Sequence, residues 1–367
     1  MKQAKLILVG GFLGAGKTTL LAQASKILVR RGMRVGLITN DQAADLVDTE
    51  TLRQVGMTVM EIAGGCFCCK FPDLVSAASR LANDCRPDVL IGEPVGSCTD
   101  LSATVLQPLK EHHASQFSLA PFSVLVDPIR LREALNPDAE SSLHPSARYI
   151  LRKQLEEADI IVLNKIDLLA SEEHAELEVM ARTEFFGVSV RAISALSSEG
   201  VEGWIDEVLK DAPAGRRIVP VDYDIYAEGE AVLGWLNATV QLLANQSTDW
   251  QEFCSNLLCS LRGKCRERNA EIVHVKLILE SSTGSYLVGN LTSNGADPSI
   301  RGSLDNSERY PELTINARVQ ISPDSLEGLV RDSLRETAGS RMEVRVVDMA
   351  SLSPGRPQPT YRYEIVV

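Results

Sequence analysis

The stretch GFLGAGKT, residues 11–18, restricts the fold of this chain more than any other part of the sequence. It fits the pattern G-x-x-x-x-G-K-[ST] without a mismatch, between an apolar run over residues 6–9 and an amphipathic run over 19–30. Glycines allow the backbone to wrap around a phosphate, so that successive N–H groups and a helix N-terminus point at negative charge. The pattern therefore predicts a strand, a phosphate-binding loop and a helix, which together begin a parallel α/β sheet.

Individual residues of this loop have expected roles. Lys17 is expected to reach the β- and γ-phosphates of a nucleotide, and Thr18 to hold Mg²⁺. The backbone of the loop and of the first helical turn is expected to surround the phosphates, through Gly11, Gly14, Ala15, Gly16 and Thr19. The alternative is a glycine-rich turn that Lys-Thr follows by chance, and the flanking strand and helix patterns disfavour it.

The tetrapeptide NKID, residues 164–167, indicates which nucleotide binds. It follows a strand pattern over residues 159–163, so its side chains are expected at the C-terminal end of that strand. There Asp167 can accept hydrogen bonds from the ring N–H and the exocyclic amine of guanine, donors that adenine does not present in that arrangement. A polar strand end is the alternative, but roughly 150 residues after a phosphate-binding loop the motif favours GTP over ATP.

Other residues complete the expected base site. Asn164 is expected to bond the opposite edge of guanine, and Lys165 to lie along the base. Ser194 and Ala195 end another short strand pattern, where a backbone N–H is expected to bond the guanine carbonyl oxygen.

A carboxylate for the magnesium site is expected in PDVLIGEPVG, residues 87–96. Residues 89–91 form a short apolar strand pattern, and Glu93 stands near its end, where it can contact Mg²⁺ directly or through water. Asp88 precedes the strand and is a less suitable partner. Asp127, at the end of SVLVD, is interpreted as a structural carboxylate at a strand end.

Three of the eight cysteines, Cys66, Cys68 and Cys69, stand within four positions in GGCFCCK. Three thiolates fill three positions of a tetrahedral Zn²⁺ site and leave one for water, another side chain or an acceptor protein. A buried structural cluster is one alternative, and a redox pair with Cys-x-x-Cys spacing but no thioredoxin-like context is another. The remaining cysteines receive no role, except that Cys98, beside the Glu93 segment, is a candidate secondary ligand.

In this order and spacing, GGFLGAGKTTLL, GGCFCC, GEPVGSCTDL and QLEEADIIVLNKIDLL resemble the CobW-type GTPases. That family is related to the GTPases that insert nickel into urease and hydrogenase. The resemblance covers about the first 200 residues and implies a P-loop GTPase that handles zinc, cobalt or another divalent metal. It also implies site residues: the cysteines of the stretch for metal, Lys17 and Thr18 for phosphate and Mg²⁺, and Asn164 and Asp167 for guanine.

The sequence also departs from the family pattern. Gly64 stands where Asn is common, and Asn40-Asp41-Gln42-Ala43 replaces a frequent Asn-Asp/Glu-Phe-Gly in the first switch segment. Glu93-Pro94-Val95-Gly96 replaces Glu-Ser/Thr-Thr-Gly, and a histidine-rich tract is missing from a chain with only five histidines, although Glu61 fits. These differences predict a divergent subgroup and concern the metal and its target more than GTP binding.

Composition excludes several other classes of protein. Hydrophobic residues make up 44% of the chain and charged residues 23%, as in globular proteins. The net charge of −12, with no dense Lys/Arg run, disfavours nucleic-acid binding. The N-terminal MKQAKLILVGGFLGAG lacks the cleavage site of a secretory signal, and no segment reaches the roughly 18 apolar residues of a membrane helix. We therefore expect a cytoplasmic protein with reduced thiols.

The chain is expected to contain two domains. Residues 1–212 are predicted to be a P-loop GTPase domain with a doubly wound, mainly parallel sheet, and 213–230 a linker. Residues 231–367 are predicted to be a smaller α+β domain of the ferredoxin-like, split βαβ type with one extra strand and a proline-rich tail. Its expected elements are strands over 232–243, 271–280, 285–291, 313–321 and 342–348, and helices over 249–268 and 323–336, the latter capped by Ser322.

The cysteine stretch lies between the first switch segment and the magnesium strand, a position that suggests a mechanism. GTP would close this region and complete the metal pocket, and hydrolysis would open it and release the metal. With the resemblance, this predicts a GTP-hydrolysing metallochaperone that delivers Zn²⁺ or Co²⁺ to a client protein or a cobalamin-related pathway, with slow turnover unless metal or a partner is present. A nucleotide-dependent dimer is a further expectation. The alternatives are a nucleotide-gated metal sensor without delivery and a plain GTPase switch with structural cysteines.

Overall fold

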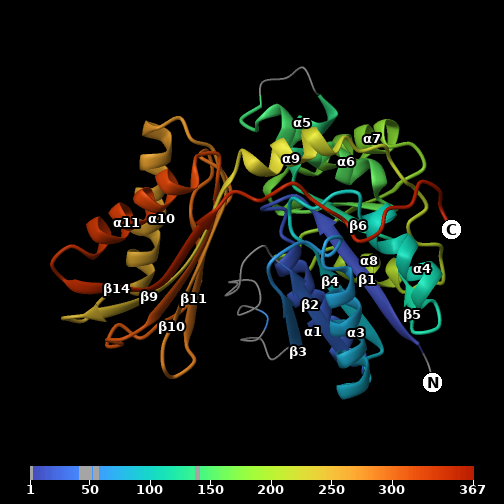
Figure 1. Ribbon diagram of the computed structural model, residues 1–367. Coiled ribbons are helices and arrows are strands. Elements are labelled where there is room, and N and C mark those ends of the chain that lie inside the picture. Colours follow the sequence, from blue (N-terminus) through green and yellow to red (C-terminus); the bar gives the residue numbers. More distant parts are fainter. Residues whose placement is uncertain (1–2, 41–51, 53–57, 137–140) are drawn as a thin grey trace.

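The computed structural model describes residues 3–40, 52, 58–136 and 141–367, and they form two sheets with helices packed on them (Figure 1). The first sheet has 8 strands in the order β3-β2-β4-β1-β6-β7-β8, with β5 beside β1. Its strands are β1 (Ala4–Gly11), β2 (Val35–Asn40), β3 (Thr58–Ile62), β4 (Val89–Glu93), β5 (Phe117–Leu119), β6 (Ser123–Val126), β7 (Ile160–Leu163) and β8 (Ser189–Ala192).

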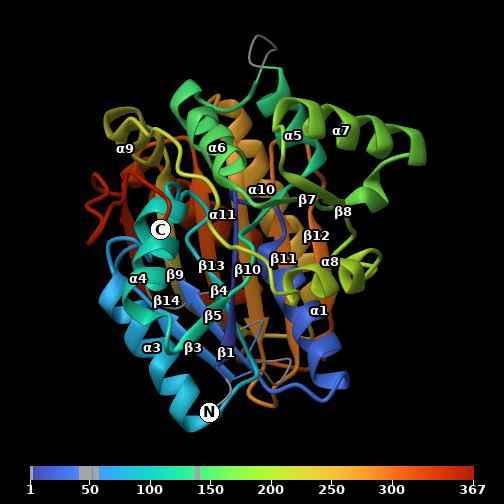
Figure 2. The ribbon, with the colours of Figure 1, turned by 90° about the vertical axis from the view of Figure 1, so that its right-hand side faces the viewer.

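The pairings recorded in the first sheet are all parallel, and helices cover both of its faces. Figure 2 shows α3 and α4 on one side of the sheet and α1 and α8 on the other. The helices are α1 (Lys17–Arg30), α3 (Phe71–Asp84), α4 (Gln107–His113) after a π-helical turn η1 (Ser102–Leu106), α5 (Pro128–Leu135), α6 (Pro145–Glu157), a 3₁₀ turn η2 (Ile166–Leu168), α7 (Ser171–Glu184), α8 (Val201–Val208) and α9 (Tyr223–Ala231).

The central strand β1 shows why a strand of such a sheet is apolar throughout. Leu6 and Leu8 are buried in the core that includes α3 and α6, whereas Ile7 and Val9 are buried in the core that includes α1 and α8. Successive side chains of a strand point to opposite faces, so both faces of this strand are covered. The chain leaves β1 at the C-terminal edge of the sheet, where doubly wound folds bind ligands. The predicted α/β class is confirmed.

The second sheet has 6 strands, all antiparallel, in the order β12-β11-β10-β13-β9-β14. Helices α10 and α11 pack their buried side chains on one face of this sheet. Its elements are β9 (Gly234–Ala244), α10 (Trp250–Glu267), β10 (Ile272–Glu280), β11 (Tyr286–Leu291), β12 (Ser299–Gly302), β13 (Glu312–Val319), α11 (Pro323–Ala338) and β14 (Met342–Leu352).

The order β14-β9-β13-β10 is that of a ferredoxin-like sheet, in which the four strands of a split βαβ unit lie as fourth, first, third and second. The predicted ferredoxin-like class is thus confirmed, and Ser322 caps α11 by accepting from the Ser325 N–H. The hairpin β11-β12 extends the sheet at its edge. Strand β12 lies between the expected strands 285–291 and 313–321. No element was expected there, because its residues are mostly exposed and carry no apolar pattern.

The second sheet turns its other face toward the first domain (Figure 1). Trp235 and Val273, which lie on that face, are buried in the core of the first domain. A Cβ added at Gly14 of the phosphate-binding loop would lie 3.5 Å from the side chain of Thr292. The second sheet therefore packs directly against the loop that follows β1.

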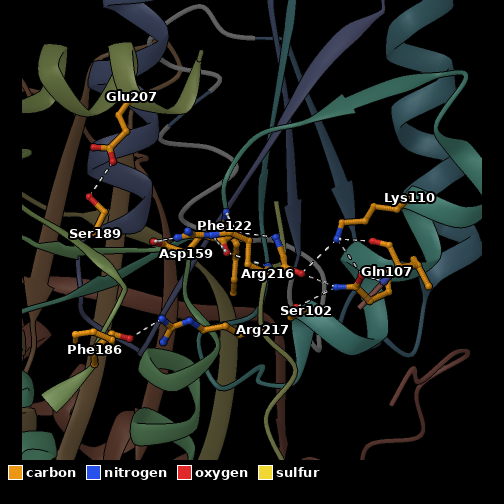
Figure 3. A network of polar contacts seen from close by, with 12 residues as sticks. Ser102, Gln107, Lys110, Phe122, Asp159, Phe186, Ser189, Glu207, Arg216 and Arg217 are labelled. Atoms are coloured by element: carbon orange, nitrogen blue, oxygen red, sulfur yellow. Dashed lines mark hydrogen bonds and ion pairs between the residues drawn. The ribbon is translucent and has the colours of Figure 1, made fainter. Parts of the chain in front are cut away.

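The segment between the two sheets is held against the first domain by Asp159, just before β7 (Figure 3). Its carboxylate accepts hydrogen bonds from the N–H groups of Phe122 (2.8 Å), Gly215 (2.6 Å) and Arg216 (3.0 Å). Gln107 donates to the Gly215 carbonyl at 2.8 Å. The expected linker 213–230 thus begins as irregular chain that is hydrogen-bonded to the first domain, and it continues into α9.

Within the described ranges, no helix combines the length and the apolar character that a membrane span requires.

Candidate functional site

The phosphate-binding loop connects β1 to α1, and its glycines are required by its backbone. Gly11, Gly14 and Gly16 have φ values of 130°, 78° and 95°. A Cβ at Gly16 would lie 2.4 Å from Nδ2 of Asn164, and one at Gly11 would lie 2.3 Å from the Leu125 carbonyl oxygen. Both the left-handed conformation and the close approach of neighbouring atoms therefore exclude a side chain at these positions.

Lys17 and Thr18 begin α1 at the mouth of this loop. The Lys17 ammonium, which is buried, donates to the Gly11 carbonyl at 2.8 Å and so lies across the concave side of the loop. Thr18 Oγ1 donates to the two carboxylate oxygens of Glu93 at 3.1 and 3.2 Å. Glu93 ends β4, so the expected magnesium residues from two elements are in contact. Their hard oxygen donors are of the kind that Mg²⁺ prefers.

Two other carboxylates, which lie at opposite edges of the sheet, have structural roles. Asp88 precedes β4 and accepts from the Arg34 N–H at 3.0 Å. Asp127 follows β6, caps α5 by accepting from the Arg130 N–H, and lies 3.6 Å from the Lys165 ammonium. The interpretation of Asp127 as a strand-end carboxylate is confirmed, and its ion pair also orients Lys165.

Asn164 connects the expected base site to the phosphate-binding loop. Its Nδ2 donates to the Ala15 carbonyl at 2.8 Å, and its Oδ1 accepts from the Ala195 N–H at 2.9 Å. Lys165 follows with φ 64°, and Asp167 lies exposed in the turn η2. The NKID residues thus fold as a rigid turn at the end of β7, with one carboxylate open to solvent.

The expected contact between guanine and the end of β8 stays a prediction. The Ser194 N–H donates to the Glu199 carbonyl at 2.9 Å, and the Ala195 N–H donates to Asn164. A bond from the Ala195 N–H to the guanine carbonyl would therefore have to replace or share its bond with Asn164.

The three clustered cysteines follow β3 and precede α3. Their Sγ atoms lie 2.7 Å apart for Cys66–Cys68, 3.3 Å for Cys66–Cys69 and 3.8 Å for Cys68–Cys69. All three fall within 4.8 Å of one another. Cys66 and Cys68 are buried, whereas Cys69 is partly exposed. The sequence shows only the spacing of the three cysteines, whereas the structure shows that their sulfur atoms face one another.

The local backbone explains this convergence. The N–H groups of Cys69 and Lys70 both donate to the Cys66 carbonyl, at 3.0 and 2.9 Å, so the chain makes one tight turn around the sulfurs. Gly64 precedes the turn with φ 79°, a left-handed conformation that Asn also tolerates, which accounts for Gly at a position where the family commonly has Asn. Helix α3 begins at Phe71, directly after the turn.

A fourth cysteine joins the cluster from another part of the chain. Cys98 Sγ lies 3.8 Å from Cys68 Sγ, and Cys98 is buried. Hydrogen bonds from Cys66 and Cys68 lower the pKa of the Cys98 thiol to about 6. The bond with Cys66 is the main cause that raises the pKa of Cys68 well above its usual value. Thiols that bind a metal ion lose their protons when they do so.

Helix α9 packs two polar side chains against this cluster. Tyr226 is fully buried and accepts from the Thr99 N–H at 3.3 Å. Glu230 is buried and accepts from the Ser97 hydroxyl at 2.6 Å. Burial is the main cause that raises the pKa of Glu230 to about 8, with smaller raising contributions from Cys66 and Cys69. These residues lie in the expected linker, and no motif in the sequence distinguishes them.

Residues 353–367, called the tail segment below, run from β14 over the cysteine cluster toward α4 (Figure 1). The Gln358 N–H donates to Cys69 Sγ at 3.2 Å, and the Thr360 N–H donates to the Cys68 carbonyl at 2.9 Å. Arg362 Nε donates to Asp100 at 2.7 Å, and the Tyr361 ring meets the Phe71 ring edge-on at 5.3 Å. The proline-rich tail has no helix or strand over residues 353–367, and as irregular chain it covers the cysteine turn.

The first switch segment can be followed only at its start. Asn40 ends β2, and its Nδ2 donates to the carbonyls of Ile62 (2.9 Å) and Gly65 (2.6 Å), which hold the cysteine turn. Asp41, Gln42 and Ala43 lie outside the described residues. Glu61, on β3, is partly buried.

Known proteins match the first domain. Residues 5–184 match the family described as CobW/HypB/UreG, nucleotide-binding domain. The chain is 30% identical over 194 residues to "Zinc chaperone CobW" of Pseudomonas aeruginosa, covering 45% of this chain and 49% of that protein. It is 26% identical over 199 residues to "Zinc-regulated GTPase metalloprotein activator 1" of Dictyostelium discoideum, covering 46% and 41%. The chain spans about half the length of the curated relatives it matches.

Solved structures match with low scores. The Zn(II)-bound YjiA GTPase from E. coli has a TM-score of 0.35 and 16% identity, covering 90% of this chain and 99% of that one. The hydrogenase maturation factor HypB from Archaeoglobus fulgidus has a TM-score of 0.39 and 20% identity, covering 56% and 88%. The family match carries the conclusion: through residues 5–184 this chain belongs to the CobW/HypB/UreG family of nucleotide-binding domains.

Proposed function

We propose that the chain binds and hydrolyses GTP and carries a divalent transition metal, Zn²⁺ or Co²⁺, which it delivers to a client protein. The observation that carries the proposal is the convergence of three thiols within 4.8 Å in a turn next to the nucleotide site. Sulfur ligands suit Zn²⁺, and the relative from Pseudomonas aeruginosa is named a zinc chaperone. Because thiolates are the ligands, we place this activity in a reducing compartment such as the cytoplasm.

For the nucleotide, the proposal assigns residues on two elements of the first domain. The loop N–H groups and Lys17 would bind the phosphates, while the turn at NKID, with Asp167 and Asn164, would bind guanine. Mg²⁺, held by Thr18 and Glu93 directly or through water, would neutralise charge on the β- and γ-phosphates. Lys17, Thr18 and Glu93 are therefore the proposed catalytic residues. Turnover is expected to be slow without metal or a partner, as in P-loop GTPases that depend on a second component.

Contacts of described residues support coupling between nucleotide and metal. Asn40, the last residue of β2 before the switch segment, holds the carbonyls of Ile62 and Gly65, which precede the cysteine turn. Glu93, which contacts Thr18, begins the loop that leads to Cys98. A nucleotide that orders the switch segment would therefore act on the cysteine turn, so that GTP favours metal binding and hydrolysis favours release.

The test measures Zn²⁺ binding to the reduced, purified chain and GTP hydrolysis in parallel. Cys66→Ala and Cys68→Ala should each abolish tight Zn²⁺ binding, while Cys85→Ala, a cysteine outside the cluster, should bind like the wild type. Lys17→Ala should abolish GTP hydrolysis and leave Zn²⁺ affinity in the nucleotide-free protein unchanged. Tight binding that survives loss of the clustered cysteines would refute the metal part of the proposal.

Delivery needs its own measurement. A zinc enzyme that co-purifies with the chain from cell extract is stripped of its metal and mixed with the Zn²⁺-loaded chain. The metal content of the enzyme is then followed with GTP, with GDP or without nucleotide. Delivery predicts transfer that is fastest during GTP turnover and absent with Lys17→Ala. Transfer at the rate of metal dissociation, whatever the nucleotide, would support a metal sensor without delivery. Sedimentation of the GTP- and GDP-bound forms tests the expected nucleotide-dependent dimer.

A further inference from the structure

Cys98 lies in the loop after β4, 30 residues from Cys68 along the chain, yet the two sulfurs are 3.8 Å apart. Only 1% of Cys98 is exposed. Its sulfur therefore reaches Cys68 from a separate element, although it lies outside the set of three sulfurs that fall within 4.8 Å of one another.

The distances can be compared with those of a metal site. Four sulfurs at about 2.3 Å from a tetrahedral Zn²⁺ lie about 3.8 Å from one another. Cys68 Sγ is 3.8 Å from both Cys69 Sγ and Cys98 Sγ, so two edges already have this length. The Cys66–Cys68 edge, at 2.7 Å, is shorter and would open on metal binding.

The position of Cys98 is fixed by its backbone. The Cys98 N–H donates to the Val95 carbonyl at 2.9 Å. The buried Gln154 of α6 donates to the Cys98 carbonyl at 2.9 Å and to the Gly96 carbonyl at 3.0 Å. A ligand held in this way loses little conformational entropy when metal binds.

We propose that Cys98 supplies the fourth thiolate of the metal site, so that the chain takes Zn²⁺ or Co²⁺ in a tetrahedral site of four sulfurs. The inference rests on the proposed function, in which Cys66, Cys68 and Cys69 bind metal. Each thiol that binds gives its proton to solvent as its sulfur–metal bond forms. The site takes a soft divalent cation and excludes Mg²⁺, which prefers oxygen.

A fourth ligand at this position has a consequence for coupling. Cys98 stands five residues after Glu93, and Glu93 accepts the hydrogen bond of Thr18 in the nucleotide site. One short, buried loop then carries a ligand of each site. Movement of Glu93 on nucleotide exchange would therefore displace Cys98, and with it a ligand of the metal, through the backbone of this loop.

The first experiment counts sulfur ligands in the wild-type chain by X-ray absorption of the Zn²⁺-loaded protein, which requires no substitution. Four sulfurs at about 2.3 Å are expected. Three sulfurs with a nitrogen or oxygen neighbour would overturn the inference and leave the proposed function standing. An absence of Zn²⁺ binding by the wild-type chain would overturn both.

Substitution then identifies the ligand. In the Co²⁺-loaded chain, Cys98→Ser should remove about a quarter of the sulfur-to-cobalt charge-transfer intensity, one thiolate of four. It should weaken Zn²⁺ binding by more than about 100-fold, since loss of even an outer partner costs about 10- to 100-fold. Cys85→Ser and Glu230→Gln are the matched controls. Glu230 is chosen because its buried carboxyl group lies beside the cysteine cluster. Unchanged spectra in Cys98→Ser, or a loss of intensity in Glu230→Gln instead, would overturn the assignment to Cys98. Guanine-nucleotide affinity of each variant reports that its first domain is folded.

Discussion

At the scale of single residues, Asn164 shows how the nucleotide site is held together. Its amide bonds the phosphate-binding loop at Ala15 and the end of β8 at Ala195, so one side chain fixes three loops relative to one another. The adjacent Gly16 has no side chain and lets this amide approach. Asp167, the carboxylate proposed to bind guanine, lies on the turn that follows.

Asp167 gives the first prediction. Asp167→Asn removes a charged acceptor for the two guanine donors, each bond being worth about 1.5–3 kcal/mol, so GTP affinity should fall by at least about 100-fold. Xanthine carries a carbonyl in place of the exocyclic amine, so the new amide can donate to it and xanthosine triphosphate should bind better than GTP. Competition binding of both nucleotides measures this. Unchanged GTP preference in the variant would show that another residue recognises the base.

Glu157 gives a prediction about pH. Burial, and then the charge of Asp100, raise its pKa from the usual 4.5 to about 8. Between these pH values the folded chain keeps a proton that the unfolded chain has lost, so the free energy of unfolding falls as pH rises, by up to about 1.4 kcal/mol per pH unit. Glu157→Gln should flatten this fall in metal-free protein unfolded by urea at pH 5 and pH 8.

The control for this prediction is built into the chain. Glu230, whose pKa burial also raises to about 8, still titrates in Glu157→Gln, so part of the fall should remain. If the variant and the wild type lose stability equally between pH 5 and pH 8, Glu157 is not protonated in the folded chain.

At the scale of elements, the tail segment is the feature that the fold of either domain does not require. It leaves the second sheet and bonds the backbone or sulfur of Cys68 and Cys69 in the first domain. The tail segment therefore continues the chain of the second sheet and is hydrogen-bonded to the expected metal site.

Gln358 allows a substitution confined to one hydrogen bond. It stands between Pro357 and Pro359, so its backbone is already restricted to the extended conformation that proline adopts. Gln358→Pro removes the N–H that bonds Cys69 Sγ, and Zn²⁺ affinity should fall by about 10- to 100-fold, as for other outer partners of metal ligands. Gln358→Ala keeps the N–H and should bind Zn²⁺ like the wild type. Equal affinities for the two variants would contradict a role for this bond.

Two arginines of the tail segment form a matched pair. Arg362 pairs with Asp100, whose side chain is 1% exposed, whereas Arg356 pairs with the largely exposed Asp224. Arg362→Ala leaves a buried carboxylate without its cation and should lower the free energy of unfolding by about 2–4 kcal/mol, less than the full cost of a buried pair because Arg362 itself is partly exposed. Arg356→Ala should cost less than about 1 kcal/mol. Urea unfolding of both variants decides, and equal losses would contradict the account.

At the scale of the whole molecule, the second sheet and the tail segment enclose the first domain at its functional edge. Val273 and Trp235 of the second sheet enter the core of the first domain, and Thr292 lies beside Gly14 of the phosphate-binding loop. The tail segment contacts the first domain at the cysteine cluster, through Cys68 and Cys69. The second sheet is thus positioned to respond to both expected ligands.

The sequence predicted what local patterns determine. The loop of residues 11–18, the strand ends at Glu93 and Asn164 and the cap at Ser322 each follow from residue types at fixed spacing, and the structure places them on the expected elements. Cys98 could be named from the sequence only as a candidate secondary ligand, because it stands beside the Glu93 segment. The packing of Tyr226 and the path of the tail segment depend on how distant elements pack. No local pattern encodes such contacts, so they could not be predicted from one sequence.

Coupling between the nucleotide site and the metal site is the central proposal, and one measurement tests it most directly. The Zn²⁺ dissociation constant of the wild-type chain is determined with Mg²⁺ plus a non-hydrolysable GTP analogue and again with Mg²⁺ plus GDP, and the affinity ratio of the two nucleotides is determined with and without Zn²⁺. Coupling predicts tighter Zn²⁺ binding with the GTP analogue, by at least about fivefold, and the same factor in the nucleotide ratio. Equal Zn²⁺ affinities in the two nucleotide states would contradict the account.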